Sequence, residues 1–398
     1  MRKVAAMTEE FGKYDFGLDA GQEERAARLH REAIIVDTLH QGPCGRRVFT
    51  DAMVEVLARE YAEHRDPQRA VLDTWNMPVR LALKGEFPAL EQVWRASGLT
   101  VTSKQIVAMG CTSDFAYSQS AFSWFSFLQQ QFDTFPWLRK ILVADDFAKV
   151  KREGLLGSFM NSQDTVDLGW DLSRIDTYHG LGMRMLQLTY NSVNHVGGGC
   201  TDRTDCGVTS FGKSFIERMN GVGVMVDISH CGRATTVDAC KLSSKPVVAS
   251  HAGCHALYAA ARNKTDDEIK YIADTGGYIG IYCLPNFLTH AEQPTVEHIL
   301  DHIDHVSGLV GWQHVGIGTD WPYSAPDEWG NARLADWMLA MGFSAKDGFA
   351  NPKVVIGFDD HRDFPNITRG LVSRGYTDEQ ILGILGGNFI RVFRETCG

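Results

Sequence analysis

The segment VGVMVDISHCGRATTVDACKLSSKPVVASH, residues 222–251, decides the fold of this chain. It holds two short apolar runs, 222–228 and 247–250, which run into His230 and His251 respectively, and a helix-like stretch lies between them. Neither run alternates strictly with polar residues, as expected of strands that are buried on both faces. The segment therefore predicts a parallel strand–helix–strand unit with a histidine after each strand.

The same unit recurs along the chain. Further apolar runs end in polar residues, and helix-like stretches separate the later runs, so strand and helix alternate about eight times. This rhythm predicts an α/β fold of the (β/α)8 TIM-barrel type. A doubly wound sheet is the rival fold, but the barrel is favoured because chemically active residues follow many strands rather than meeting at one crevice. The other expected strands are 34–36, 105–109, 155–159, 183–189, 278–282 and 315–318.

Composition narrows the class of protein. The chain has 398 residues, 39 Lys and Arg against 49 Asp and Glu, and a formal net charge of −10. A nucleic-acid binder needs a basic face, and an acidic protein docks poorly on anionic membranes, so neither partner is expected. There is no apolar window long enough for a transmembrane helix, and Glu9 and Glu10 interrupt the apolar start of a secretory signal. Nine cysteines without a CxxC pair fit a reducing cytoplasm.

We expect a single domain over residues 1–398, with insertions at about 41–104 and 116–150. The second insertion begins with an aromatic stretch, AYSQSAFSWFSFLQQQFDTFPWL, at 116–138. One interpretation is a core helix that covers the barrel. The other is a wall of an apolar substrate pocket or an oligomer interface.

Three residues at strand ends are candidates for a metal site. The carboxyl ends of barrel strands share one rim, so His230 and His251 should converge there. Two neutral imidazoles suit Zn²⁺ or another borderline metal, although two core histidines bonded to backbone are the alternative. Asp320 ends the last strand. It could complete the metal site or act as general base toward a metal-bound water, or else cap the turn that follows.

Other polar residues near the strand ends are candidates for contacts with a substrate. Arg262 lies in the loop after His251 and could bind a substrate carboxylate with both arms of its guanidinium, or else be a surface arginine before a helix. Tyr190 could donate a hydrogen bond to a developing oxyanion. Asn161 and His40 each follow a predicted strand, and we assign them to substrate binding.

Eight pieces of the chain together resemble the renal (membrane) dipeptidase family of metallopeptidases, which are (β/α)8 barrels. In that family two metal ions, usually zinc, lie at the barrel mouth, and a bridging hydroxide attacks the amide of a dipeptide. The resemblance implies that His230 and His251 bind one metal, that Asp320 is the acid/base carboxylate and that Arg262 binds the substrate carboxylate. It also implies a homodimer. The pieces are LGMRMLQLTYN (181–191), GCTDRTDCGVTSFG (199–212), VMVDISHCG (224–232), PVVASH (246–251), ARNKTDDEI (261–269), HIDHVSGLVG (302–311), HVGIGTD (314–320) and GGNFIRVF (386–393).

Part of the family's site is missing here. Leu39 and Gln41 stand where the family has a His-x-Asp pair, and residues 157–161 hold no carboxylate where the family has a bridging Glu. Tyr190 replaces a family histidine that helps to bind the reacting carbonyl. Two cations a few ångströms apart repel strongly, and a bridging carboxylate reduces that repulsion. A binuclear site is therefore not expected.

These observations predict one divalent metal, zinc first, held by His230, His251 and Asp320. We expect a divergent dipeptidase-like metalloenzyme that acts on a small, carboxylate-bearing and partly apolar substrate. Amide or ester hydrolysis comes first, with lyase or decarboxylase chemistry left open. The alternative is a metal-free acid/base catalyst, or a binding protein without catalysis, on the same fold.

Overall fold

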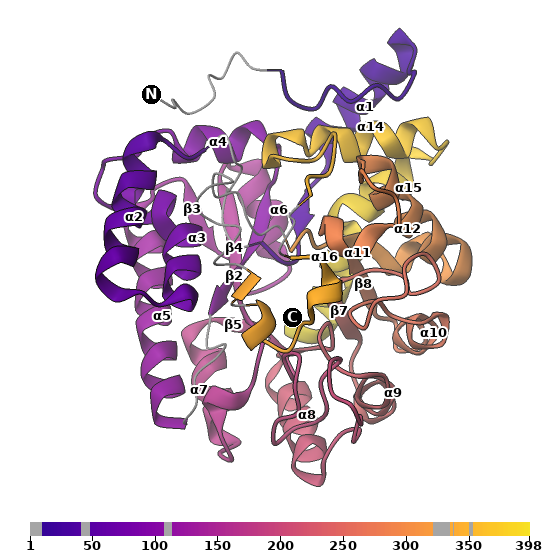
Figure 1. Ribbon diagram of the computed structural model, residues 1–398. Coiled ribbons are helices and arrows are strands. Elements are labelled where there is room, and N and C mark those ends of the chain that lie inside the picture. Colours follow the sequence, from indigo (N-terminus) through magenta and orange to yellow (C-terminus); the bar gives the residue numbers. More distant parts are fainter. Residues whose placement is uncertain (1–9, 41–47, 107–113, 321–334, 337, 350–352) are drawn as a thin grey trace.

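The computed structural model describes residues 10–40, 48–106, 114–320, 335–336, 338–349 and 353–398 (Figure 1). Eight parallel strands follow one another in the order β1-β2-β4-β5-β6-β7-β8-β9. The first and last strands meet through the Thr38 amide, which donates to the Ile317 carbonyl at 3.0 Å, and the Asp320 amide, which donates to the Leu39 carbonyl at 2.9 Å. The ring is therefore closed, and the predicted (β/α)8 barrel is confirmed over the doubly wound sheet.

Each of the eight predicted apolar runs overlaps a barrel strand, although the run at 34–36 shares only Val36 with β1, and a short extra strand, β3, pairs with β4 outside the ring. β2 begins four residues before the predicted run, and the end of that run, 107–109, lies outside the described residues. The strands are β1 (Val36–Asp37), β2 (Val101–Ile106), β3 (Leu138–Lys140), β4 (Leu156–Ser162), β5 (Met183–Gln187), β6 (Met225–Asp227), β7 (Val247–Ala252), β8 (Tyr278–Ile281) and β9 (Val315–Ile317).

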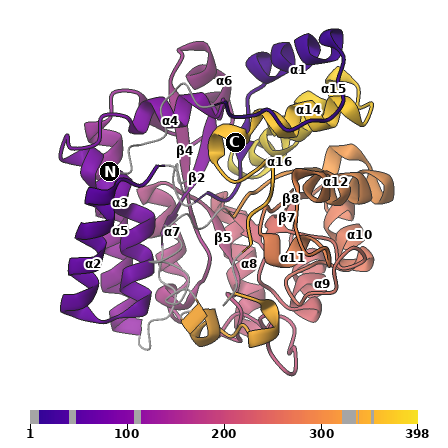
Figure 2. The same ribbon diagram turned by 45° about the horizontal axis from the view of Figure 1, so that its top comes forward.

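Helices surround the ring, and α2, α3 and α5 form a group on one side of it (left in Figures 1 and 2). α2 to α4 lie in the first predicted insertion, and α5, β3 and α6 lie in the second. The helices are α1 (Ala20–Glu32), α2 (Asp51–His64), α3 (Pro67–Leu83), α4 (Leu90–Ala96), α5 (Asp114–Thr134), α6 (Asp145–Arg152), α7 (Ser173–Leu181), α8 (Ser210–Val222), α9 (Arg233–Leu242), α10 (Asp266–Asp274), α11 (Pro285–Leu288), α12 (Val296–Val310), α14 (Pro365–Ser373), α15 (Asp378–Leu382) and α16 (Asn388–Cys397).

Short helical turns complete the chain. They are η1 (Val166–Leu168), η2 (Trp312–His314), η3 (Ala345–Asp347), η4 (His361–Asp363) and the π-helical turn η5 (Gly383–Gly387). Local sequence accounts for several helix starts. At α10, for example, the Thr265 side chain accepts from the Glu268 amide, and the Glu268 carboxylate accepts from the Thr265 amide, which is a capping box.

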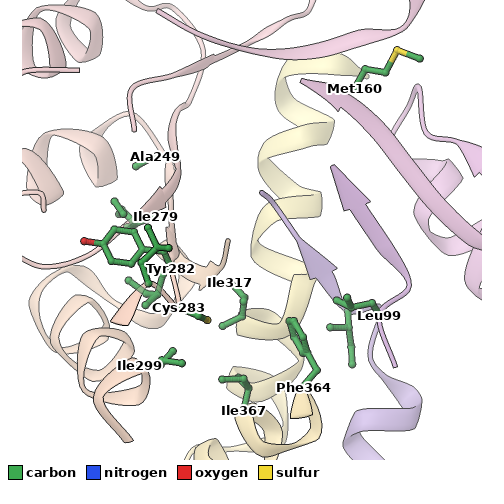
Figure 3. Packing of buried hydrophobic residues seen from close by; sticks show 14 of the residues in the cluster. Leu99, Met160, Ala249, Ile279, Tyr282, Cys283, Ile299, Ile317, Phe364 and Ile367 are labelled. Atoms are coloured by element: carbon green, nitrogen blue, oxygen red, sulfur yellow. The ribbon is translucent and has the colours of Figure 1, made fainter. Parts of the chain in front are cut away.

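The apolar core has two layers. The larger layer lies between the strands and the surrounding helices, and Figure 3 shows members from the sheet, Ile279 and Ile317, together with Ile299 of α12 and Ile367 of α14. The smaller layer joins side chains from seven barrel strands to α16. Its members from the strands are Val36, Val101, Phe159, Met185, Met225, Val248 and Tyr278, and those from α16 are Phe389, Val392 and Phe393.

The barrel interior turns polar toward the carboxyl ends of the strands. Side chains two residues apart on a strand point to the same face. The residue two positions after a strand member of the smaller apolar layer therefore also points into the barrel. These positions are buried and polar: Thr38, Ser103, Asn161, Gln187, Asp227 and Ser250. The change places hydrogen-bonding groups beneath the barrel mouth. Among the helices that the structure describes, none has the length and apolar character needed to cross a membrane.

Candidate functional site

His230 and His251 meet at the barrel mouth. β6 and β7 are hydrogen-bonded neighbours, and each histidine follows or ends one of them. The two Nε2 atoms lie 3.0 Å apart, the ring centroids are 5.0 Å apart, and both side chains are buried. Burial, followed by the positive charge of Arg262, lowers the pKa of both imidazoles well below the usual value, so both rings are neutral.

The tautomer of His251 follows from its hydrogen bonds. The Ser250 hydroxyl donates to Oδ2 of Asp227 at 2.5 Å and also lies 2.8 Å from Nδ1 of His251. A hydroxyl has one proton, so Nδ1 of His251 must donate to the Ser250 oxygen. Nε2 of His251 therefore carries a lone pair, the form in which an imidazole binds a metal.

The tautomer of His230 is determined in the same way. Nδ1 of His230 lies 2.7 Å from Oδ1 of Asn191, while the amide nitrogen of Asn191 donates to the Met341 carbonyl at 2.7 Å. The Asn191 oxygen is therefore an acceptor, and Nδ1 of His230 is its donor. Each ring therefore presents an Nε2 lone pair, and the two Nε2 atoms lie 3.0 Å apart. The pair thus fits a divalent transition metal, with the supporting bonds that metal-binding histidines usually have.

A third group, Gln163, reaches the same pair. Its amide nitrogen donates to Nε2 of His251 at 3.0 Å, and its amide oxygen accepts from the Gln105 side chain. A neutral amide therefore lies beside the imidazoles, where a carboxylate would offset the charge of a cation. Sequence reasoning missed Gln163. The available signal was its position directly after β4, on the same face as Phe159 and Asn161.

Asp320 lies next to the pair but is not hydrogen-bonded to it. Its Oδ2 is 4.0 Å from Nε2 of His251, and its side chain is mostly buried. Burial raises the pKa of Asp320 to about 7, and the charge of Arg262 opposes that rise. Its backbone has a φ of +45°, an uncommon conformation for a residue other than glycine. The hydrogen bond from the Asp320 amide to the Leu39 carbonyl holds the residue in this conformation.

Arg262 is buried at the site, so the alternative of a surface arginine is wrong. Its Nη1 donates to the Ser229 carbonyl, and its Nη2 donates to the His251 carbonyl at 3.3 Å. These bonds join the ends of β6 and β7. Each terminal nitrogen carries a second N–H, so the guanidinium can still donate to a carboxylate.

Tyr190 covers the other side of His230. The two rings stack with centroids 4.0 Å apart and an interplanar angle of 22°. Burial raises the pKa of the phenol above its usual range, and the nearby charge of Asp320 adds to this effect. Tyr190 is therefore a hydrogen-bond donor at neutral pH.

The two remaining predicted residues are Asn161 and His40. Asn161 is fully buried in β4, and both polar atoms of its amide lack a hydrogen-bond partner within the described part of the chain. His40 is also buried and packs against His361, with ring centroids 3.9 Å apart, rather than against His230. Gln41, the other substituted position, lies outside the described residues.

The aromatic stretch at 116–138 forms most of α5. Phe125 and Leu128 are buried in the core, which agrees with a helix that covers the barrel, whereas Phe122 is 58% exposed. α5 also lines a crevice with α3 and β2. The crevice residues include Gln105, the donor to Gln163, and the full lining is Asn76, Val79, Lys104, Gln105, Trp124, Leu128 and Gln131.

Known proteins resemble this chain in sequence. A sequence model of the membrane dipeptidase family (peptidase family M19) matches residues 127–341 and 340–397. The dipeptidase tcpJ of Claviceps purpurea is 30% identical over 63% of the chain, and an uncharacterized dipeptidase of Schizosaccharomyces pombe, C965.12, is 27% identical over 65%. The matches span 54% and 58% of the lengths of these relatives.

Solved structures share the fold over nearly the whole chain. An amidohydrolase from Pseudomonas aeruginosa is 25% identical, with a TM-score of 0.73 over 94% of this chain and 99% of that one. A metallo peptidase from Rhodobacter sphaeroides, liganded with a phosphinate mimic of the dipeptide L-Ala-D-Ala, is 19% identical, with a TM-score of 0.69 over 92% of this chain and 100% of that one.

Proposed function

Since the chain belongs to the membrane dipeptidase family (peptidase family M19), we propose that it is a metal-dependent hydrolase of small substrates in which an amide or ester bond lies near a free carboxylate. The observation that carries the proposal is the pair of Nε2 lone pairs of His230 and His251, 3.0 Å apart. The dipeptidase relatives supply the reaction class, and the geometry of the pair supports a metal at the barrel mouth.

One divalent metal, zinc first, would be held by His230, His251 and Asp320. Such an ion polarises a carbonyl and lowers the pKa of a bound water. Within the described residues, Asp320 is the carboxylate that lies within 4.0 Å of the imidazole pair, so a second ion beside the first would have little negative charge to offset it. Gln163, which is neutral, is the group that reaches His251.

The protein's own side chains perform the remaining tasks. Asp320 lies next to His251 and can accept a proton from a nucleophilic water and return it to the leaving group. The Tyr190 phenol can donate a hydrogen bond to the oxygen that gains negative charge. Arg262 can donate its second N–H groups to the substrate carboxylate. These contacts are strong because the groups are largely shielded from water.

The crevice between α3, α5 and β2 has room for about one water molecule, with a free volume of ≈ 10 Å³, so it does not hold the apolar part of a substrate. Trp124 and Leu128 form an apolar wall, and Gln105 joins the crevice to Gln163 and so to His251. No observation on the described residues favours lyase or decarboxylase chemistry, so neither is proposed.

A metal-free acid/base protein is the second candidate, and one contact favours it. The Gln163 amide donates to the same lone pair of His251 that a metal would need. In that case the imidazoles, Asp320 and Tyr190 would act without a cation.

Metal analysis combined with an activity screen tests the proposal. The purified protein would be assayed on dipeptides, N-acyl amino acids and amino acid esters before and after chelation, beside the variants His230→Asn and Tyr190→Phe. We expect hydrolysis that chelation abolishes and zinc restores, with a loss of roughly 1,000-fold or more in His230→Asn. The matched control is His305→Gln, a partly buried histidine paired with Asp266 away from the mouth. Full activity of metal-free protein would overturn the proposal in favour of the second candidate.

A further inference from the structure

A second cluster of metal-ligating side chains contains neither His230 nor His251. It consists of Asp37 at the end of β1, His40 just after it, and His361 of η4. One potential ligand atom from each of the three side chains lies within 4.8 Å of those of the other two. All three side chains are buried, with at most 1% exposed.

We propose that Asp37, His40 and His361 form a second binding site for a divalent transition metal. The site shares no ligand with the His230–His251 pair. Two imidazoles and one carboxylate are a set that binds zinc or ferrous iron with positions left open for water, whereas magnesium and calcium prefer oxygen ligands. This site goes beyond the proposed function, which uses the other pair.

The carboxylate is oriented in the way that metal-binding carboxylates usually are. Oδ1 of Asp37 accepts from the amides of Leu39 and Thr319 at 3.2 and 2.9 Å. Oδ2 accepts from the Thr319 hydroxyl at 2.6 Å. A carboxylate oxygen has two lone pairs, so Oδ2 can still bind another partner. Hydrogen bonds of this kind hold ligands in place and are a regular part of metal sites.

His361 is positioned by a rigid turn. Asp360 accepts from the Arg362 backbone amide at 3.0 Å and forms a buried ion pair with the Arg362 guanidinium at 2.8 Å. The Phe11 ring packs on that guanidinium at 3.9 Å, and the Gly12 amide donates to Asp363 at 2.9 Å. The N-terminal segment thus packs over η4 and keeps the His361 ring against His40.

The charges around the cluster restrict which metal could bind there. The Asp37 side chain is buried, so little water reaches its carboxylate. A cation would offset the cost of a buried carboxylate. The positive charge of Lys104 reaches His40 and opposes any cation. The binding must therefore come from strong nitrogen ligation, which zinc, cobalt and iron provide.

Metal counting on separate variants tests this site. Wild-type protein, His361→Asn, His230→Asn and the double variant would be dialysed against Zn²⁺ or Co²⁺, and bound metal measured by mass spectrometry. We expect about two equivalents in wild type, about one in each single variant and almost none in the double variant. The control, His305→Gln, should keep about two equivalents. Loss of metal only in His230→Asn, with His361→Asn unchanged, would overturn the second site and leave the proposed function intact.

A measurement on wild type covers the case in which a variant fails to fold. Crystals soaked in Co²⁺ would be measured at the cobalt edge, and circular dichroism would report the fold of each variant. We expect anomalous density between His40, His361 and Asp37. Density confined to the His230–His251 pair would refute the second site, and density confined to the Asp37 cluster would support it while removing the basis of the proposed function.

Discussion

Nε2 of His230 and Nε2 of His251 lie 3.0 Å apart, and in each ring the other nitrogen is already a donor, to Asn191 and to Ser250. Neither Nε2 carries a proton, so each offers a lone pair, and that of His251 also accepts from the Gln163 amide. The hydroxyl and amide groups that support this pair can be changed individually.

Removing the hydroxyl that orients His251 should weaken metal binding at the pair. In Ser250→Ala, Nδ1 of His251 loses its acceptor, and the ring can adopt the other tautomer. We expect the affinity of this site for zinc to fall roughly 10- to 100-fold, measured by competition with a chelating dye. Ser243→Ala is the control, because that hydroxyl donates to the Lys245 carbonyl at the end of α9. Equal affinities in the two variants would contradict the role of Ser250.

Replacing the neutral amide beside His251 by a carboxylate should strengthen metal binding. In Gln163→Glu, the competing N–H donor is removed, a negative charge is added, and the Gln105 amide can still donate to the new carboxylate. We expect zinc to bind roughly tenfold tighter or more. Gln163→Met removes the donor without adding charge and should gain less. A titration in which the Glu variant binds no tighter than the Met variant would contradict the electrostatic account.

Arg262 should determine the preference for substrates with a free carboxylate. We expect wild type to favour such a substrate over its neutral amide, and Arg262→Gln to lose roughly 10- to 100-fold of that preference, measured as a ratio of kcat/KM values. The ratio distinguishes carboxylate binding from the structural role of Arg262, which joins the ends of β6 and β7. Loss of the structural role would lower the kcat/KM values of both substrates alike. Arg233→Gln, which breaks only an exposed ion pair with Asp267, is the control. An unchanged ratio in Arg262→Gln would show that Arg262 joins the strand ends but does not bind the substrate carboxylate.

Asp167 should make the folded state less stable as the pH rises. Its Oδ2 accepts from the Tyr178 hydroxyl at 2.5 Å, and burial raises its pKa from 3.8 to about 7. Between these two pKa values the folded state keeps a proton that the unfolded state has lost. The contribution of protonated Asp167 to the free energy of unfolding is therefore complete below about pH 4 and is lost as the pH rises through about 7. Each unit of pKa difference corresponds to about 1.4 kcal/mol.

Urea unfolding at several pH values between these limits checks this sign. The free energy of unfolding of wild type should decrease between about pH 4 and 7 more than that of Asp167→Asn. Asp176→Asn, which removes an exposed partner of Arg218, should follow the wild-type slope. If the free energy of unfolding varied with pH in the same way in wild type and in Asp167→Asn, the Asp167 carboxyl would titrate alike in the folded and the unfolded state.

Gly318 should tolerate no side chain, because the barrel wall passes close to it. A Cβ at this position would lie 1.8 Å from the Ser250 carbonyl oxygen and 2.6 Å from Oγ1 of Thr38. We expect Gly318→Ala to lower the free energy of unfolding by about 1–3 kcal/mol or more, measured in urea. Gly180→Ala in α7 meets nothing within 4 Å and should be neutral or stabilising. Equal stability of the two variants would contradict the close packing around Gly318.

The strands that form the barrel could be predicted because each is an apolar run buried on both faces. The extra strand β3 could not, since Leu138–Lys140 carries two basic residues and pairs outside the ring. The convergence of His230 and His251 followed from their places after neighbouring strands. Gln163 was missed because an amide is seldom read as part of a metal site, and His361 was missed because no predicted strand precedes it.

The sequence by itself determined that eight strands and their helices close into a barrel, and that two imidazoles reach its mouth, because both follow from periodicity and position along the chain. Only the tertiary structure decided which ring nitrogen of each histidine carries the proton. The choice follows from hydrogen bonds to Asn191 and Ser250, whose geometry depends on how the strand ends pack together. It also decided that His40 pairs with His361 rather than with His230. Contacts between the first strand and the C-terminal segment depend on how the whole chain packs, which no local pattern records.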